Sequence, residues 1–257
     1  MQLTINIKKS LNEIANEYFE KSKKLRRKSE NAVKIIDKFK KQLAEIDNKQ
    51  LQIESREDSK EEARPLEWFE KFRWFISSEG FLCIGGRDAT SNEIVIKKHI
   101  DSSDMVFHTE SPGSPFFVIK TERKTPGEAT IQETAIATAS YSKAWKMGVS
   151  VTEVFWVTPD QVSKQAPSGE YMPKGAFMVR GKRNFIQSTL GLAIGKLKNG
   201  KVMGGPLDAV AKNCESAIKI TLGKDKPSDV AKKIAKKINA HVDDVMRVLP
   251  AGGLSLS

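Results

Sequence analysis

The sequence predicts an α+β fold, a mixed sheet with packing helices that is preceded by a long N-terminal coiled-coil helix. Three observations predict it. Residues 2–64 contain no glycine or proline and repeat apolar side chains at helical spacing. Residues 65–195 alternate short β-prone runs with glycine-containing connections, and residues 196–257 include a lysine-rich amphipathic pattern. We therefore divide the chain into a coiled-coil arm (1–64), a central domain (65–195) and a basic C-terminal extension with helices (196–257).

The arm is predicted to be one helix with an N-cap at Ser10. Its apolar side chains recur at helical spacing and form one stripe, which consists of Leu11, Ile14, Tyr18, Leu25, Ala32, Ile35 and Phe39. A helix of about fifty residues is roughly 75 Å long, which is too long to bury that stripe against a small domain. We therefore expect the arm to pair with another helix, from a second copy of this chain or from a different chain.

A cluster of six positive charges lies on the arm between Lys21 and Lys28. Like charges one turn apart weaken an isolated helix, so something should offset their repulsion. A phosphate backbone does so by releasing its condensed counterions. A solvated coiled-coil face is the alternative, and the sequence leaves both interpretations open.

The excess positive charge of the chain is concentrated in one later segment. The 257 residues carry a net charge of +11, and 39% of them are apolar, which is enough to support a packed core. Residues 180–237 hold 14 Lys and Arg against 4 Asp and Glu, whereas residues 65–179 hold 12 against 14. Such a segment is typical of a surface that holds a polyanion. A solvated lysine-rich surface is the alternative.

The residues that commonly bind metals are too few and too scattered to predict a metal site. Cys83 and Cys214 fit no disulfide framework or zinc spacing, and each is predicted to be a small buried residue. His99, His108 and His241 complete no ligand set with them, and no cofactor motif is present. The sequence has no apolar run near 18 residues and no signal-peptide core. We therefore expect a cytoplasmic protein that does not enter a membrane.

Short apolar runs separated by turn residues predict the strands of the central domain. After an apolar, aromatic run at 68–76, the β-prone runs are Phe81–Ile84, Glu93–Ile96, Met105–His108, Phe116–Lys120 and Val154–Val157. Capping boxes of the form T-x-x-E at Thr125 and Thr130 predict a helix that runs to about Trp145. Its alanines suit close packing against a sheet.

The C-terminal extension is predicted to add strands and helices. Leu190–Ile194 has the composition of a core strand, and the hairpin turn after it is KNGKV. A helix and a strand are then predicted from GGPLDAVAKNCESAIKI. A further helix begins at Pro227, and its Val230, Ile234 and Ile238 should face the core. Its outward face should consist of Lys232, Lys233, Lys236 and Lys237.

Polar residues near two predicted turns are candidates for ligand contacts. Arg87 follows a pair of glycines, and its guanidinium suits a phosphate or a base edge. An ion pair with Asp88 or Glu93 that holds the turn is the alternative. Lys97 and Lys98 lie at the exit of the same connection.

His108 ends a strand before the loop TESPGSP. The Ser114 hydroxyl and the backbone amides of that loop are groups of the kind that cradle a phosphate. A hydrogen-bonded structural histidine is the alternative interpretation of His108. Lys143, near the end of the predicted helix, suits the helix dipole or an external phosphate.

The segment from Pro159 to Asn184 interleaves basic and aromatic side chains. Its candidate contacts to a phosphodiester are Lys164, Lys174, Arg180, Lys182 and Arg183. Aromatic faces can stack on bases while basic groups position the backbone. Tyr171 is the stacking candidate, whereas Phe177 is predicted to lie in the core.

Four ordered blocks of the sequence together resemble a known domain family. They are EKFRWFISSEGFLCIGGRDATSNEIVIKKH, MVFHTESPGSPFFVIK, YSKAW and PDQVSKQAPSGEYMPKGAFMVRGKRN. They resemble the NFACT-R domain, the C-terminal module of RqcH-type ribosome quality-control factors and of their archaeal and eukaryotic relatives. The segment YFEKSKKLRRK is similar to the second helix of the coiled-coil arm that precedes this domain in the family. The resemblance implies that tRNA and the large ribosomal subunit are the partners.

The expected function is that of a non-enzymatic RNA-binding module of a ribosome-associated quality-control factor. No nucleophile elbow, Walker loop or paired metal-ligand spacing is present in the sequence. The first alternative is an RNA-modification enzyme or its accessory subunit, with His108, Glu170 or Cys83 carrying the chemistry. The second alternative is a coiled-coil scaffold for protein partners.

Overall fold

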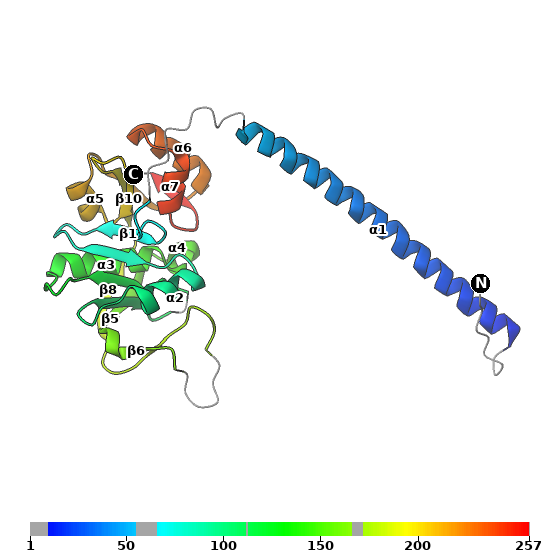
Figure 1. The fold of residues 1–257 in the computed structure, drawn as a ribbon, viewed down its shortest axis with the longest axis horizontal. Coiled ribbons are helices and arrows are strands. Elements are labelled where there is room, and N and C mark those ends of the chain that lie inside the picture. The colour runs from blue at the N-terminus through cyan, green and yellow to red at the C-terminus, as the bar shows by residue number, and fades with distance from the viewer. Residues whose placement is uncertain (1–9, 55–65, 112, 166–171, 257) are drawn as a thin grey trace. The chain divides into compact units, whose positions relative to one another are not determined.

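The computed structural model describes residues 10–54, 66–111, 113–165 and 172–256 (Figure 1). It divides into two compact units, Met1–Pro65 and Leu66–Ser257. The first contains one long helix, and the second contains antiparallel sheets with packing helices, so the predicted α+β class is confirmed. Within the described residues, no helix combines the length and the apolar character that a membrane span requires.

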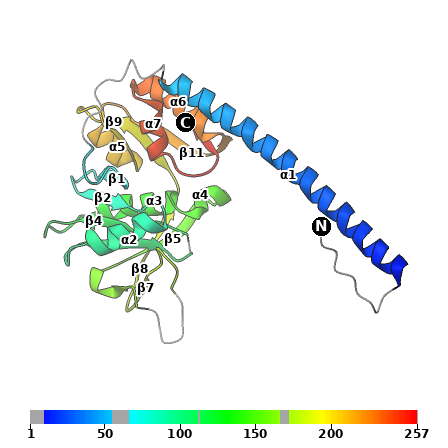
Figure 2. The ribbon, with the colours of Figure 1, turned by 45° about the vertical axis from the view of Figure 1, so that its right-hand side comes forward.

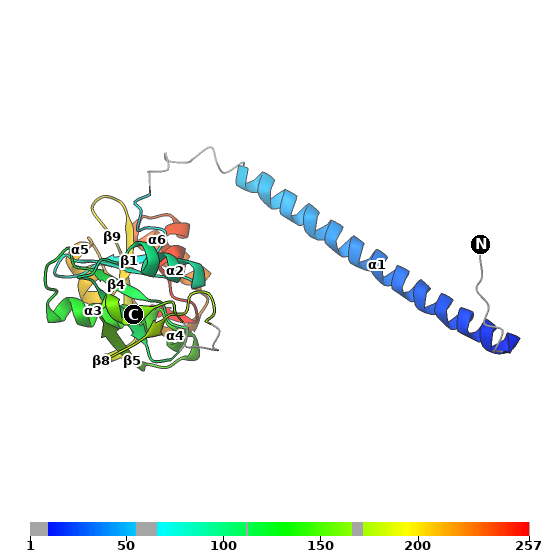
Figure 3. The same ribbon diagram turned by 60° about the horizontal axis from the view of Figure 1, so that its bottom comes forward.

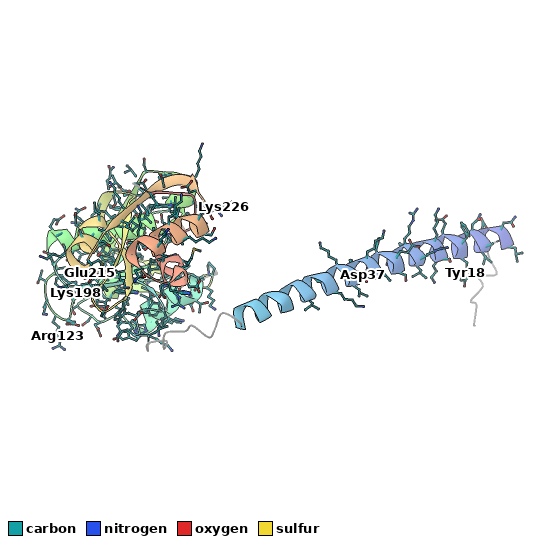
Figure 4. All side chains as sticks on the ribbon, turned by 90° about the horizontal axis from the view of Figure 1, so that it is seen from above. Tyr18, Asp37, Arg123, Lys198, Glu215 and Lys226 are labelled. Carbon is teal, nitrogen blue, oxygen red and sulfur yellow. The ribbon has the colours of Figure 1, made fainter. Side chains whose placement is uncertain are left out.

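Helix α1 (Leu11–Glu54) begins after Ser10, as the sequence predicts, and Ser10 forms a capping box with Glu13. The Ser10 amide donates to Glu13 Oε2 at 2.8 Å, and the Glu13 amide donates to Ser10 Oγ at 3.4 Å. The apolar stripe is exposed: Leu25, Ile35 and Phe39 are 57%, 54% and 59% accessible. Figure 4 shows the side chains that project from this helix, Tyr18 and Asp37 among them.

The larger sheet of the second unit is formed by strands of the central domain. Its strands are β1 (Arg73–Ile76), β2 (Leu82–Gly85), β3 (Met105–Thr109), β4 (Phe117–Lys120), β5 (Val151–Val157) and β8 (Asn184–Thr189). Their spatial order is β1-β2-β4-β3-β5-β8, and each neighbouring pair is antiparallel. The expectation of a mixed sheet is thereby refined to an antiparallel one. A short 3₁₀ turn, Pro159–Gln161, leads from β5 into the ladder of β6 (Val162–Ser163) and β7 (Met178–Val179).

A second sheet is formed by the C-terminal part of the chain. Its strands are β9 (Leu192–Lys196), β10 (Val202–Gly205), β11 (Ile218–Asp225) and β12 (Leu254–Leu256), in the order β10-β9-β11-β12. The helices are α5 (Leu207–Asn213), α6 (Pro227–Ile238) and α7 (Val242–Val248). Helix α6 packs against β9, β11 and β12 and against α7 (Figure 2). As predicted, Val230, Ile234 and Ile238 are buried and its four lysines are exposed.

The helix predicted to run to Trp145 is two helices, α3 (Glu128–Ser140) and α4 (Lys143–Met147). Helix α3 packs against β3, β4, β5 and β8 (Figure 3). Its alanines Ala135, Ala137 and Ala139 are fully buried, as expected. The Ser142 hydroxyl accepts a hydrogen bond from the Ala144 amide at 3.1 Å and starts α4. Lys143 therefore lies in the first turn of a helix, so its predicted place near a helix C-terminus is wrong.

The segment Glu93–Ile96, predicted as a strand, lies in helix α2 (Ala89–Lys98). Asp88 caps this helix: its Oδ1 accepts from the Ser91 amide at 2.8 Å, and Ser91 Oγ accepts from the Asp88 amide at 2.8 Å. A reciprocal capping box specifies a helix start and outweighs the β-preference of a short branched run. Only Val95 of that run is fully buried.

Strand β9 extends across residue 195, where the sequence divides the domain from its extension. The hydrophobic cluster of the larger sheet also includes Ala193, Met203 and Val210 from the second sheet and α5. Strands β1 and β10 contact each other as well. The extension thus folds together with the central domain.

Candidate nucleic-acid interface

A cavity of about 590 Å³ opens between β1, the start of α2, the loop between β3 and β4, and residues 174–179. It brings together side chains from segments that are far apart in the sequence. The predicted site residues that line it are Arg87, His108, Ser114, Lys174 and Arg183. Arg73 and Tyr141, which the sequence analysis did not single out, line it too.

Arg73 and Arg87 are half-buried and bind backbone carbonyls. Arg87 Nη2 donates to the carbonyl oxygen of Phe72 at 3.0 Å, and Arg73 Nη1 donates to that of Leu249 at 2.9 Å. Burial lowers the pKa of Arg87, and the positive charge of Arg73 lowers it further. The guanidinium of Arg73 also lies 4.1 Å from the ring centroid of Tyr141. The Arg87 ion pairs that the sequence left open are not formed with Asp88 or Glu93, because Asp88 caps α2 and Glu93 binds Lys164.

The glycine pair before Arg87 serves close packing. A Cβ atom on Gly85 would lie 2.5 Å from the ring of Phe117, and one on Gly86 would lie 1.9 Å from Asn92 Oδ1. Asn92 Oδ1 accepts a hydrogen bond from the Phe116 amide at 3.1 Å. The absence of side chains at both glycines therefore lets α2 and β4 pack closely at this wall of the cavity.

His108 belongs to an aromatic wall of the cavity. Its ring stacks on Phe116 at 4.2 Å between centroids, and Phe177 meets Phe116 edge-on at 5.5 Å. His108 Nδ1 lies 2.7 Å from the carbonyl oxygen of Thr109, which can only accept, so this nitrogen carries a proton. Burial lowers the pKa of His108 although that hydrogen bond raises it, so the imidazole is neutral at pH 7.

Two basic residues of the predicted segment are held by internal contacts. Lys164 Nζ lies 2.8 Å from Glu93 Oε1 and donates to the carbonyl oxygens of Pro173 and Ala176 at 3.0 Å. Arg183 Nη1 lies 2.8 Å from Glu110 Oε2, and its guanidinium lies 4.9 Å from the centroid of Phe155. These side chains brace the loop around the cavity, so they are poor choices for testing surface contacts.

Three other basic residues of the segment, Lys174, Arg180 and Lys182, are exposed. Gln161 Nε2 donates to the carbonyl oxygens of Arg180 and Lys182 at 2.8 and 2.9 Å and so fixes the turn between them. That turn needs the left-handed backbone of Gly181, with φ of 83°. The three cations are thus displayed on a braced loop.

The remaining predicted residues have different settings. Ser114 is buried, and its hydroxyl accepts from the Thr109 amide and donates to the Pro115 carbonyl, so it holds the loop from within. Lys143 is exposed, and its side chain covers the Cα of Gly113 at the cavity rim.

Lys97 and Lys98 are exposed at the end of α2, and Lys97 lies 3.7 Å from Glu93. Tyr171 and Glu170 lie outside the described residues.

Little in the local sequence marks Arg73 and Tyr141 as residues of a ligand site. Arg73 is one cation between Phe72 and Trp74 in an apolar run, where a charge needs an internal partner. Tyr141 follows a run of small residues and resembles an ordinary helix end. Its hydroxyl donates to the carbonyl oxygen of Val248 at 2.7 Å, a contact that only the tertiary structure creates.

Burial disfavours the reactive thiolate form of both cysteines, including Cys83 of the enzyme alternative. The Cys83 thiol is fully buried beside Thr134, and burial raises its pKa to about 12, so it is protonated at neutral pH. Cys214 is half-buried, and burial raises its pKa to about 11. Among the described residues, no group of three His, Cys, Asp or Glu side chains could hold a metal ion.

Comparison with known proteins identifies the domain. A family model described as the NFACT protein RNA binding domain matches residues 71–181. The chain carries an NFACT-R domain. This confirms the resemblance in the four sequence blocks. The NFACT-R residues supply β1 to β7 and most of the cavity, whereas Leu249 and Ala251 come from beyond the matched region.

Proteins similar to this chain occur in archaea and animals. The NFACT-R chain is 39% identical over 196 residues to the archaeal Rqc2 homolog aRqcH of Methanocaldococcus jannaschii, an alignment that covers 74% of this chain and 29% of that protein. It is 47% identical over 137 residues to the ribosome quality control complex subunit NEMF homolog of Drosophila melanogaster, covering 51% of this chain and 14% of the relative. For human ribosome quality control complex subunit NEMF the identity is 38% over 173 residues, with 67% and 16% covered. The chain thus spans less than a third of each relative's length.

Proposed function

We propose that this chain is a non-enzymatic RNA-binding module of a ribosome quality-control factor, and that it docks on tRNA or on large-subunit ribosomal RNA. The NFACT protein RNA binding domain at residues 71–181 carries the proposal. The names of its relatives, which are subunits of ribosome quality control complexes, supply the cellular context.

The surface chemistry supports this function. Lys174, Arg180 and Lys182 are exposed on one braced loop, and Lys143 adds a further cation at the cavity rim. Cations displayed in this way attract the phosphate backbone of RNA independently of its sequence. Helix α6 presents a second basic face through its exposed lysines, and Lys226 projects at its N-terminus (Figure 4).

Binding to tRNA and to a ribosomal RNA hairpin across a salt titration tests the function. We expect binding by the intact chain whose affinity falls steeply with salt. A variant with Lys174, Arg180 and Lys182 changed to Ala should bind more weakly and should lower the slope of log K against log salt by about 2–3. Lys164 and Arg183 are left unchanged because they brace the loop.

The matched control changes Lys124, Lys198 and Lys212 to Ala, which removes the same charge from exposed positions outside residues 174–183. It should leave most of the affinity and of the salt slope intact. Equal losses in both triple variants would reduce the proposal to nonspecific attraction by net charge. Affinity of the intact chain weaker than about 10⁻⁴ M would contradict it and favour the scaffold alternative.

We also propose that helix α1 pairs with a second helix, from another copy of the chain or from a different chain. The exposed stripe that includes Leu25, Ile35 and Phe39 is the supporting observation. Sedimentation of the intact chain should show reversible self-association in the range of tens of micromolar, and changing Leu25 and Phe39 to Gln should abolish it. A monomer at every concentration would contradict pairing between copies.

A further inference from the structure

The cavity beside Arg73 has the dimensions of a ligand site. Its volume of about 590 Å³ lies within the range of small-molecule sites, roughly 300–1,000 Å³. Its walls come from β1, the start of α2, the β3–β4 loop, β5 and residues 174–179, and Ala251 lies at one side. Residues inside the matched family region and beyond its C-terminal end therefore shape it.

The charge inside the cavity favours an anion. Arg73 and Arg87 both line it, and their guanidinium groups donate to carbonyl oxygens of Leu249, Arg247, Phe72 and Glu70. No described carboxylate forms an ion pair with either arginine, and Arg87 Nε is buried without a hydrogen-bond partner. Two half-buried cations without a counter-charge are unfavourable until an anion binds them.

The carboxylates that line the cavity are already engaged. Asp88 Oδ1 caps α2 through the Ser91 amide, and Glu110 Oε2 lies 2.8 Å from Arg183 Nη1. Lys174 adds another cation at the opening. The cavity therefore keeps a net positive lining that matches the phosphate group, which guanidinium groups bind through paired N–H donors.

The other wall of the cavity favours a planar apolar group. His108 and Phe177 are half-buried and line the cavity, with Phe116 and Phe155 packed behind them. The neutral His108 ring adds no charge to this side. Unstacked bases of single-stranded RNA bind such aromatic surfaces, with their phosphates on nearby basic groups.

We propose that the cavity receives one unstacked nucleotide of the bound RNA, its base against His108 and Phe177 and its phosphate at Arg73 and Arg87. The proposal rests on the RNA-binding function proposed above and adds a defined site for one nucleotide. A free mononucleotide carries the same base and phosphate, so the experiment must distinguish it from a nucleotide of bound RNA.

Photo-crosslinking and affinity measurements on the intact chain test the proposal. The probe is a short single-stranded RNA that carries one 4-thiouridine. Crosslinks should map to peptides that contain His108 or Phe177. Arg73→Met should remove these crosslinks and weaken RNA binding by about tenfold or more, because a bidentate contact is lost. Arg73→Lys should recover only part of the affinity.

Ala251→Trp keeps both arginines and tests the cavity without removing a charge. Ala251 is exposed at the edge of the cavity, so the larger ring should block entry and leave the core intact. It should abolish the same crosslinks, while circular dichroism and the Tm remain those of the unmodified chain. An Arg73→Met chain that fails this folding check is set aside, and Ala251→Trp then decides the question.

The failures of the two proposals are distinguishable. RNA binding by the unmodified chain without crosslinks to the cavity peptides, or crosslinks that persist unchanged in Ala251→Trp, would overturn the nucleotide site and leave the RNA-binding function standing. Absence of RNA binding by the unmodified chain would overturn both. Calorimetric titration with 5′-mononucleotides tests whether the ligand is a free nucleotide. Tight binding of a free mononucleotide, together with unchanged RNA affinity in Arg73→Met and Ala251→Trp, would overturn the proposal that the nucleotide belongs to RNA.

Discussion

Replacing Lys120 with methionine should lower the free energy of unfolding by about 3–5 kcal/mol. The side chain of Asp104 is fully buried, and Lys120 is its charge partner at the end of β4. Lys120 Nζ also lies 2.6 Å from Asp101 Oδ2 and donates to the carbonyl oxygen of His99 at 2.9 Å. Without the ammonium group, a buried carboxylate is left without an opposite charge. Urea denaturation followed by circular dichroism measures the loss.

Lys124→Met is the matched control, because Lys124 is exposed four residues further along the chain. It should change the free energy of unfolding by no more than about 0.5 kcal/mol. Adding Asp104→Leu to Lys120→Met should recover part of the loss, since an apolar pair replaces the ion pair. The recovery should be incomplete, because Asp104 also accepts from the Thr121 amide at 3.0 Å. A loss below about 1 kcal/mol in the single variant would contradict the account.

Replacing Phe117 with alanine should cost about 3–5 kcal/mol of unfolding free energy. Phe117 is fully buried, stacks on Tyr141 at 6.0 Å between centroids, and lies 6.3 Å from Phe75. Its ring also occupies the space that a Cβ of Gly85 would need. Loss of the ring leaves a cavity beside Tyr141, on whose ring Arg73 also lies. Denaturation curves measure the stability, and RNA affinity should fall as well because Arg73 loses its support.

Phe185→Ala on β8 is the control for the loss of a phenylalanine, because Phe185 is 51% exposed. It should cost no more than about 1.5 kcal/mol, a cost that includes its edge-on contact with Phe155. Double replacement of Phe117 by Ala and Gly85 by Ala tests the shared space, because the added methyl group partly fills it. A Phe117→Ala chain as stable as Phe185→Ala would contradict the packing described for Gly85.

Local signals in the sequence were sufficient for several elements. The N-cap at Ser10, the hairpin turn at KNGKV and the buried face of α6 lie where the sequence predicts them. Each depends on residues within a few positions of one another, so spacing alone specifies it. Helix α2 is an exception, because the β-branched run at residues 94–96 favours a strand whereas the capping box of Asp88 with Ser91 specifies a helix start.

Among the candidate site residues, the sequence indicates loops that the structure brings together around one cavity, but it does not indicate the contacts of each side chain. Lys164 and Arg183 were expected at the RNA surface, yet each is held by a carboxylate from a distant segment. Ser114 was expected to offer its hydroxyl, which instead bonds within its own loop. Such assignments depend on neighbours that only folding brings close.

The sequence by itself determined the fold class, the long helix, the basic segment and the family, because periodicity, composition and ordered motifs are local properties of the chain. Only the tertiary structure decided that Arg73 and Arg87 meet in one cavity beside Tyr141, His108 and Phe177. The place of Arg73 in that cavity depends on the C-terminal end of α7, where the carbonyl oxygen of Leu249 binds Arg73 across 176 positions of sequence. Contacts of such separation leave no periodic trace in the sequence, and geometry alone reveals them.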